Sequence, residues 1–214
     1  MESTWGADLS GLVNGLLTAL TLTVVGFAAA LVLGLLAAAC RVSPVRPLRA
    51  VGTLYVELFR NIPLLCLLVL IVFGLPDVGV LLPLTIAVVS ALAAVNGAFA
   101  CEAIRSGMNA VPAGAIDAAR SLGLGYGATL RLIVFPVALR RSLQPLVNVF
   151  ISTLLGSSLA SAVGVVDLIG AAQIINLREA WGLALFAAAA GVYVAIALGA
   201  GALGIVLERR WSRT

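Results

Sequence analysis

Histidine and lysine are both absent from this 214-residue chain, and charged residues of any kind make up only 10% of it. Soluble domains carry about a quarter charged residues, so the chain lacks the polar surface that a water-soluble protein needs. Without histidine it cannot form a serine–histidine catalytic pair, and without lysine it cannot form the GxxxxGK[ST] phosphate loop of ATPases. Because 62% of the residues are hydrophobic, the composition indicates a membrane protein that is not an enzyme.

Cysteine is scarce as well, with three residues in or beside apolar runs: Cys40, Cys66 and Cys101. None belongs to a CxxC pair, so we predict neither a disulfide framework nor a metal site. A free cysteine packs like a small hydrophobic side chain. We therefore interpret all three as packing residues and expect no cofactor.

Long stretches without charge dominate the chain and predict an all-α membrane protein with five transmembrane helices in a single domain, residues 1–214. A spanning helix needs roughly 20 apolar residues. The second stretch falls short of this and contains Pro63 and Pro76. No arginine precedes the first stretch, so we expect a retained span rather than a signal peptide. The expected spans cover about 12–40, 62–76, 81–101, 143–166 and 182–207.

Arginine is distributed unevenly, and this predicts the orientation. Three segments (41–60, 102–141 and the C-terminal tail) hold twelve of the thirteen arginines: Arg41, Arg46, Arg49, Arg60, Arg105, Arg120, Arg131, Arg140, Arg141, Arg209, Arg210 and Arg213. All three segments lie on one side if residues 61–101 cross the membrane twice, or enter and return. Basic loops face the cytoplasm, so we expect the N-terminus outside and the C-terminus in the cytoplasm.

Residues 102–141 are too long for a simple helix connection and show internal order. Pro112 suits the first turn of a helix, and Gly123 suits the cap at its C-terminus. A second helix is expected over 128–135, which Pro136 should end or kink.

The surface of this loop allows two interpretations. Ala118 and Ala119 would let a partner surface approach closely, with Asp117, Arg120 and Arg131 as polar contacts at the rim. An interfacial helix lying on lipid headgroups explains the same residues. The residues alone leave both interpretations open.

Inside the expected spans there is no Asp, Glu or Arg, which argues against a proton-coupled carrier. Gln144, Asn148 and Ser152 follow at intervals of four and share one helix face. They could line a translocation pathway, or could simply form hydrogen bonds between helices. The candidate pathway residues are Asn96, Gln144, Asn148, Ser152, Ser157, Ser158 and Ser161.

A motif with long fixed spacing occurs in the basic loop. Asp117-Ala118-Ala119 is followed after three residues by Gly123, after nine more by Ile133, and then by Phe135-Pro136. This resembles the EAA motif of binding-protein-dependent ABC importer permeases, with Asp117 in place of the usual Glu and Phe135 in place of Leu.

Further segments resemble the polar amino acid (histidine/glutamine/glutamate-type) permeases of that family, over about residues 10–180. They are Glu57–Leu65, Glu102–Gly107, Ala118–Leu124 and Ser158–Val165, and residues 41–45 are most similar to glutamate-type permeases. One departure is that Leu155 and Gly156 stand where related permeases often have Lys-Asp or Lys-Asn.

The resemblance implies a type I ABC importer permease fold in a bacterial plasma (inner) membrane. The expected substrate is glutamate or another polar amino acid. The cytoplasmic EAA coupling loop, about 110–136, would contact a separate ATPase through Asp117, Ala118, Ala119, Arg120, Gly123, Ile133 and Pro136. The expected partners are an ABC ATP-binding subunit dimer, an extracytoplasmic solute-binding protein, and a second permease subunit, either a different homologous chain or an identical one. A secondary carrier or channel not driven by ATP is the alternative.

Overall fold

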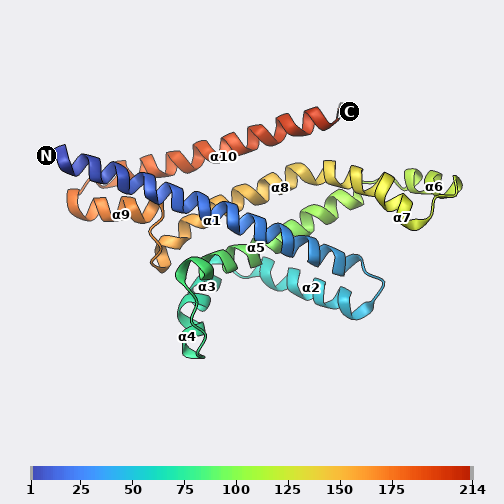
Figure 1. Ribbon diagram of the computed structural model, residues 1–214, viewed down its shortest axis with the longest axis horizontal. Helices are drawn as coiled ribbons and strands as arrows, with labels where there is room; N and C mark the ends of the chain where they lie inside the picture. Colours follow the sequence, from blue (N-terminus) through green and yellow to red (C-terminus); the bar gives the residue numbers. More distant parts are fainter. Residues whose placement is uncertain (1, 213–214) are drawn as a thin grey trace.

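Every regular element is helical in the computed structural model, which describes residues 2–212 and the side chains of residues 8–210 (Figure 1). This confirms the expected all-α class. Four stretches are long and apolar enough to cross a membrane, and a bent pair of helices is the candidate for a fifth, as either a broken span or a re-entrant loop. The four stretches are Asp8–Val42, Leu84–Asn109, Tyr126–Val163 and Leu183–Arg210. They belong to α1 (Glu2–Val42), α5 (Leu84–Asn109), α7 to α8 (Tyr126–Thr129 and Phe135–Ser157) with the 3-10 turn Ser158–Val163, and α10 (Leu183–Ser212).

The bent pair occupies the region where a loop followed by a short second span was expected. Residues 46–61 form the amphipathic helix α2 (Arg46–Asn61), which buries Gly52 and Val56. Pro63 then interrupts the helix, and α3 (Leu64–Val69), a π-helical turn and α4 (Leu75–Asp77) follow at 102° to α2. The expectation of a loop was wrong because charge along an amphipathic helix resembles the charge of a loop.

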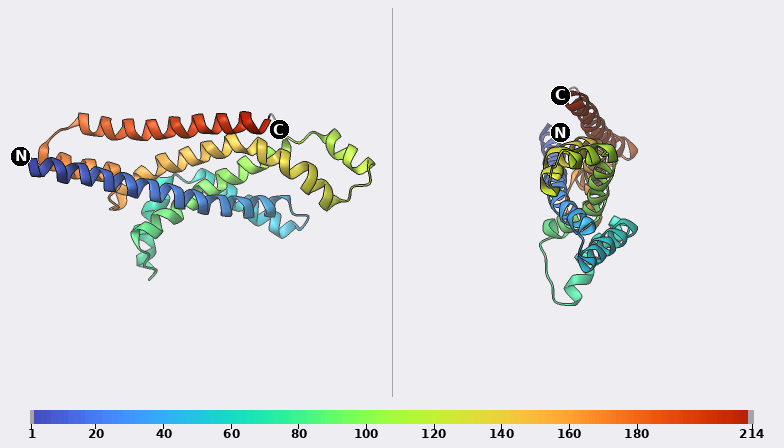
Figure 2. Two further views of the ribbon diagram at one scale, coloured as in Figure 1. Left: turned by 45° about the horizontal axis from the view of Figure 1, so that its top comes forward. Right: turned by 90° about the vertical axis from the view of Figure 1, so that its right-hand side faces the viewer.

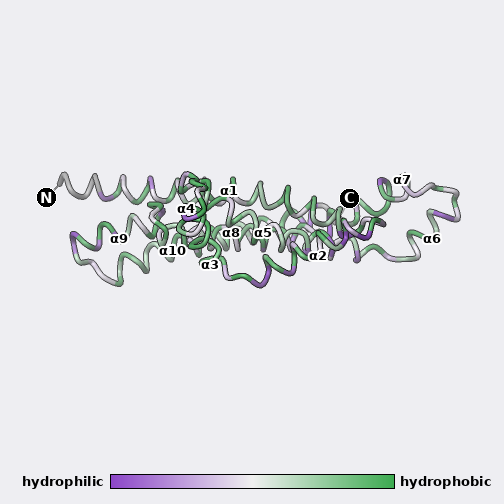
Figure 3. Tube along the Cα trace, turned by 90° about the horizontal axis from the view of Figure 1, so that it is seen from below, coloured by the Kyte–Doolittle hydropathy of each residue, from purple (hydrophilic) through white to green (hydrophobic). Residues whose placement is uncertain are grey.

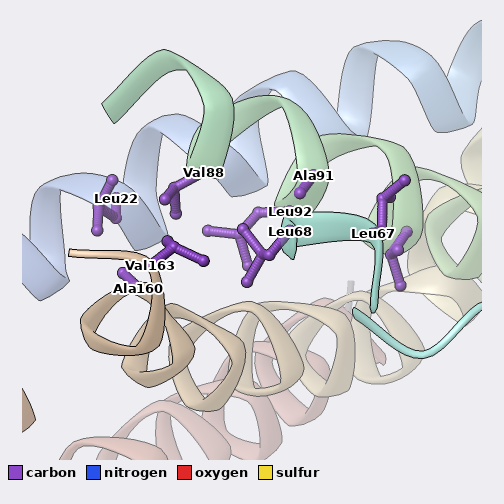
Figure 4. Close-up of a cluster of buried hydrophobic side chains, with 9 residues drawn as sticks. Leu22, Leu67, Leu68, Val88, Ala91, Leu92, Ala160 and Val163 are labelled. Atoms are coloured by element: carbon purple, nitrogen blue, oxygen red, sulfur yellow. The ribbon is translucent and has the colours of Figure 1, made fainter. Parts of the chain in front are cut away.

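The core forms where α5 lies between α1 and α8 (Figure 1). Leu22 of α1, Leu68 of α3 and Leu92 of α5 are almost fully buried, and they meet Val163 of the 3-10 turn (Figure 4). Small residues bring α1 and α5 together. A Cβ added to Gly34 would lie 2.7 Å from the Cβ of Ala100. Close backbone approach of this kind is how helices associate in lipid.

The two ends of the bundle differ in charge. α6 (Ala113–Ser121), α7 and the C-terminus lie at one end, whereas the N-terminus and α9 (Leu168–Glu179) lie at the other (Figures 1 and 2). Hydrophilic stretches lie near α6 and α7, at the end of α9 and between α2 and α3, and the rest of the middle is mainly hydrophobic (Figure 3). Residues 110–136 and the end of α10 thus lie toward one end, as the predicted orientation requires, and α2 runs from that end toward the middle (Figure 1). Arg213 lies outside the described residues.

The structure decides between the two expectations at Pro136. The helix does not end there, because a π-helical turn over Leu130–Val134 leads directly into α8. That turn, directly before Pro136, distorts the regular helix at the place where a kink was the other expectation. Because proline has no N–H to donate, the regular hydrogen-bond pattern of the α-helix is interrupted at that place.

Candidate functional site

The turn that ends α6 has the geometry predicted for Gly123. This residue has φ 76°, in the left-handed region. Its N–H donates to the carbonyl of Arg120 at 2.9 Å, and the N–H of Leu124 donates to the carbonyl of Ala119 at 3.0 Å. These two bonds form a Schellman motif. The motif fixes the direction in which the chain leaves α6.

The loop that contains α6 projects from the end of the bundle (Figure 2). Asp117, Ala118 and Arg120 are exposed, as are Gly123 and Pro136, and Ile133 is half-buried. Ala119 differs from the expectation, because it is only 3% exposed. Of the two alanines, only Ala118 is exposed on the surface of the loop.

A cavity of about 390 Å³ opens between α5 and α8. We call it the α5–α8 cavity, and it is lined by Phe99, Ala103, Pro145, Asn148, Val149 and Ser152. Asn148 and Ser152 are exposed and one helical turn apart. The structure therefore brings two of the candidate pathway residues to one cavity wall.

The other candidates lie elsewhere. The Oε1 atom of Gln144 lies 3.0 Å from a Cβ built on Gly204, so this side chain faces α10. Asn96 is 1% exposed and donates to the carbonyl of Leu92 at 3.0 Å. Ser157 is buried beside the Thr23 hydroxyl at 3.3 Å. Ser158 and Ser161 donate to carbonyls three residues earlier. None of these five lines the α5–α8 cavity.

A second cavity, of about 470 Å³, lies between α2 and α5 and has a polar, charged lining. Glu102 of α5 is its centre: its carboxylate pairs with Arg41 of α1, with Arg105 Nη2 at 3.4 Å and with Arg60 Nη1 at 3.7 Å. We call it the α2–α5 cavity, and it is lined by Arg41, Val56, Glu57, Arg60, Asn61, Phe99, Glu102 and Arg105.

Sequence reasoning did not identify this charged cluster as a site. The third span was expected to end at residue 101, but α5 continues to Asn109, so Glu102 and Arg105 stay on the helix and face α1 and α2. A signal did exist. The segments Glu57–Leu65 and Glu102–Gly107 each carry a Glu followed three residues later by an Arg. Such pairs fit a salt-bridged contact between helices as well as exposed loops.

A buried polar group also marks the opposite end of the bundle. The Asp167 carboxylate is fully buried and accepts hydrogen bonds from the Gly170 N–H at 2.8 Å and the Tyr193 hydroxyl at 3.2 Å. It caps α9 at its N-terminus. Burial raises the pKa of the Asp167 carboxyl, and the two hydrogen bonds oppose part of that rise. The Asp8 carboxylate pairs with Arg178 at this end too.

Comparison with known proteins identifies the family. The family described as "Binding-protein-dependent transport system inner membrane component" matches residues 30–213. A probable glutamine ABC transporter permease protein, GlnP of Bacillus subtilis (strain 168), is 39% identical over 88% of each chain. The glutamate transport system permease protein GluC of Corynebacterium glutamicum is 35% identical over 77% of this chain and 78% of that protein. A crystal structure described as an amino acid ABC transporter with histidines has a TM-score of 0.92 and 33% identity, covering 97% of both chains. The chain therefore belongs to the binding-protein-dependent transport system inner membrane component family, as a multi-pass inner-membrane permease subunit of a bacterial ABC transporter whose ATPase is a separate subunit.

Proposed function

We propose that this chain is the permease subunit of an ATP-driven importer of polar amino acids. The observation that carries the proposal is the α6 loop, which projects from the arginine-rich end with a defined cap and exposed polar residues. Relatives named for glutamine and for glutamate support the class of substrate. Glutamate is the member that residues 41–45 favour, and it is the first to test beside glutamine.

In this proposal the α6 loop is a rigid contact with the ATP-binding subunit. Asp117, Ala118 and Arg120 supply the contact surface, and Gly123 sets the angle of the loop. Ala119, Ile133 and Pro136 maintain its shape. Movement of the ATPase subunits is transmitted to α8, because the chain continues as helix from α7 through the π-helical turn into α8. The pathway then opens toward the solute-binding protein on the other side.

We propose a different, homologous chain as the second permease subunit. Related permeases often carry Lys-Asp or Lys-Asn where this chain has Leu155 and Gly156. A Cβ at Gly156 would lie 2.7 Å from the Leu64 side chain and 3.2 Å from that of Leu92. A larger residue at this position would make the ends of both leucine side chains shift. In this proposal a partner subunit supplies the missing polar groups. Amino acid uptake with this chain as the only permease would contradict this part of the proposal.

Reconstitution tests the function. The chain, a homologous second permease subunit, the ATPase and a solute-binding protein are placed in proteoliposomes, and uptake of labelled glutamine and glutamate is measured with and without ATP. We expect uptake only with ATP and all components. Uptake by the chain without the ATPase would instead indicate a secondary carrier or channel.

Site-directed crosslinking tests the coupling surface. In a variant lacking Cys40, Cys66 and Cys101, a single cysteine replaces Ala118, and the matched control places it at Leu177, which is exposed at the other end of the bundle. We expect Ala118→Cys to crosslink to the ATP-binding subunit and Leu177→Cys not to do so. Equal crosslinking of both positions would contradict the proposed contact.

A further inference from the structure

Two contacts hold the first half and the middle of α2 against its neighbours. A Cβ added to Gly52 would lie 2.9 Å from the Cβ of Cys40, so the backbones of α2 and α1 approach each other closely there, as packed helices in lipid do. The Tyr55 hydroxyl donates to the carbonyl of Ala94 on α5 at 2.8 Å. The helix ends a few residues later, directly before the bend of 102° that leads into α3. Whatever holds the last turn of α2 therefore also sets the position of this bend.

Arg60 holds that last turn on α5. Its Nη1 atom lies 3.7 Å from Glu102 Oε1, and its guanidinium carbon lies 5.5 Å from the centre of the Phe99 ring, in a cation–π contact. Glu102 also pairs with Arg41 and Arg105, so three arginines share one carboxylate. The Arg60 side chain is 45% exposed, against 15% for Arg41, and its pairing distance is the longest of the three. Arg60 is thus the arginine that Glu102 releases most readily.

A second acceptor for Arg60 lies on α2 itself. Glu57 is exposed, lines the same cavity and forms no ion pair in the part of the chain that the structure describes. It precedes Arg60 by three residues, and residues with this spacing are neighbours on a helix surface. Glu102 and Arg105 have the same spacing and are paired at 3.4 Å. A change of rotamer at Arg60 would therefore exchange a bond to α5 for a bond within α2.

We propose that Arg60 is a latch: paired with Glu102 it holds the end of α2 on α5, and paired with Glu57 it releases that end. Release exposes Val56, which is 2% exposed in the structure, and opens the α2–α5 cavity. The two arrangements differ little in free energy, because each contains one largely exposed ion pair and such pairs contribute little to stability. The latch goes beyond the proposed function, since it concerns the position of α2 and holds for any solute.

Protection of a buried thiol tests the latch. Val56→Cys is introduced into a variant in which alanine replaces Cys40, Cys66 and Cys101, and the permease–ATPase complex is placed in lipid nanodiscs without solute or ATP. The reaction with a water-soluble maleimide is followed over time. When α2 opens and closes faster than the thiol reacts, the rate reports the fraction of open molecules. Ile175→Cys, at a position that is 3% exposed on α9 at the other end of the bundle, reports any general loosening.

Two variants should change the reaction rate in opposite directions. Arg60→Gln should speed labelling of Val56→Cys by about 2- to 5-fold, the range expected for loss of an exposed ion pair. Glu57→Gln removes the competing acceptor and should slow labelling by about 2-fold. Arg49→Gln is the matched control and should leave the rate unchanged, because Arg49 is exposed on the same helix and outside the cavity. Direct charge effects on the thiol have the opposite sign, because a nearby cation favours the reactive thiolate and a nearby carboxylate disfavours it.

The double variant Glu57→Gln/Arg60→Gln shows whether Glu57 acts through Arg60. If it does, the double variant should label as fast as Arg60→Gln alone. Equal slowing by Glu57→Gln with and without Arg60 would overturn the latch. Unchanged labelling of Val56→Cys in Arg60→Gln would also overturn it, as would faster labelling of Ile175→Cys in that variant.

The latch and the proposed function are judged by different measurements. Labelling needs no transport, so absence of ATP-driven uptake in the wild type would contradict the proposed function and leave the latch standing. Normal uptake in the wild type together with unchanged labelling in Arg60→Gln would do the reverse.

Discussion

Substituting Gly123 tests whether the shape of the α6 loop transmits force. The residue has φ 76°, and a Cβ built there meets no heavy atom within 4 Å. The cost of Gly123→Ala is therefore backbone strain alone, about 1–2 kcal/mol for a non-glycine residue in the left-handed region. Since 1.4 kcal/mol is a factor of ten, the Schellman turn should become roughly 5- to 30-fold less populated relative to open forms.

The expected result is lower ATP-driven uptake and weaker ATPase association, measured by proteoliposome transport and pull-down, with normal membrane insertion. Gly127→Ala is the control: that glycine also has open space around it, but it lies inside α7 and has no positive φ. Gly123→Asn should be milder because asparagine tolerates the left-handed region. Gly123→Asp adds a charge to the docking surface and should block uptake. Normal ATPase association in Gly123→Asp, or equal uptake in Gly123→Ala and Gly127→Ala, would refute the reasoning.

Three other changes probe the pathway, the core and the buried acid. Asn148→Leu should reduce uptake while the complex still assembles on affinity purification, and unchanged uptake kinetics would reassign Asn148 to packing. Gly34→Leu should destabilise the chain by about 1–3 kcal/mol in a thermal denaturation assay, because its Cβ would lie 2.7 Å from the Cβ of Ala100; Gly199→Leu, with no atom within 4 Å of the new Cβ, should not. Burial raises the pKa of the Asp167 carboxyl, so the folded state holds this proton more tightly than the unfolded state and stability should fall as pH rises above about 4. Asp167→Asn should flatten that pH dependence in the same assay, and an unaltered pH profile would show that the shift has another source.

The sequence predicted the parts of the fold that depend on local patterns. The length of the apolar stretches predicted the long helices, and the distribution of arginines predicted which segments lie at the same end. Gly123 predicted the cap at the C-terminus of α6. The sequence did not predict α2, because charge at Arg46, Arg49 and Arg60 suits a loop and an amphipathic helix equally. The choice between them depends on whether Gly52 and Val56 find a surface on which to pack, and that is a tertiary property.

The candidate pathway residues do not all line the same cavity, and the reason is again tertiary packing. Periodicity correctly put Asn148 and Ser152 on one face, but it grouped Gln144 with them, although that side chain reaches toward Gly204 of α10. The spacing of residues along a helix shows roughly which face of that helix a side chain lies on. It does not show which neighbouring helix packs against that face. Predicting the charged cluster around Glu102 would have required knowing how three helices pack together, because its members come from α1, α2 and α5.

The two groups of variants separate recognition from force transmission, which the chain locates in different places. The α6 loop is outside both cavities, so its variants should leave amino acid binding intact and change uptake and ATPase association together. Asn148 lines the α5–α8 cavity and lies outside that loop, so Asn148→Leu should reduce uptake and leave ATPase association intact. The chain has no phosphate-binding motif of its own. The movement driven by ATP hydrolysis must therefore be transmitted to the translocation pathway through helices that connect these regions. α8 is the direct connection, because one end continues from the α6 loop and its middle carries Asn148 and Ser152. A variant that stiffens or breaks the π-helical turn between them should therefore uncouple ATP hydrolysis from uptake while both binding events persist, a result seen in the ratio of ATP consumed to solute imported.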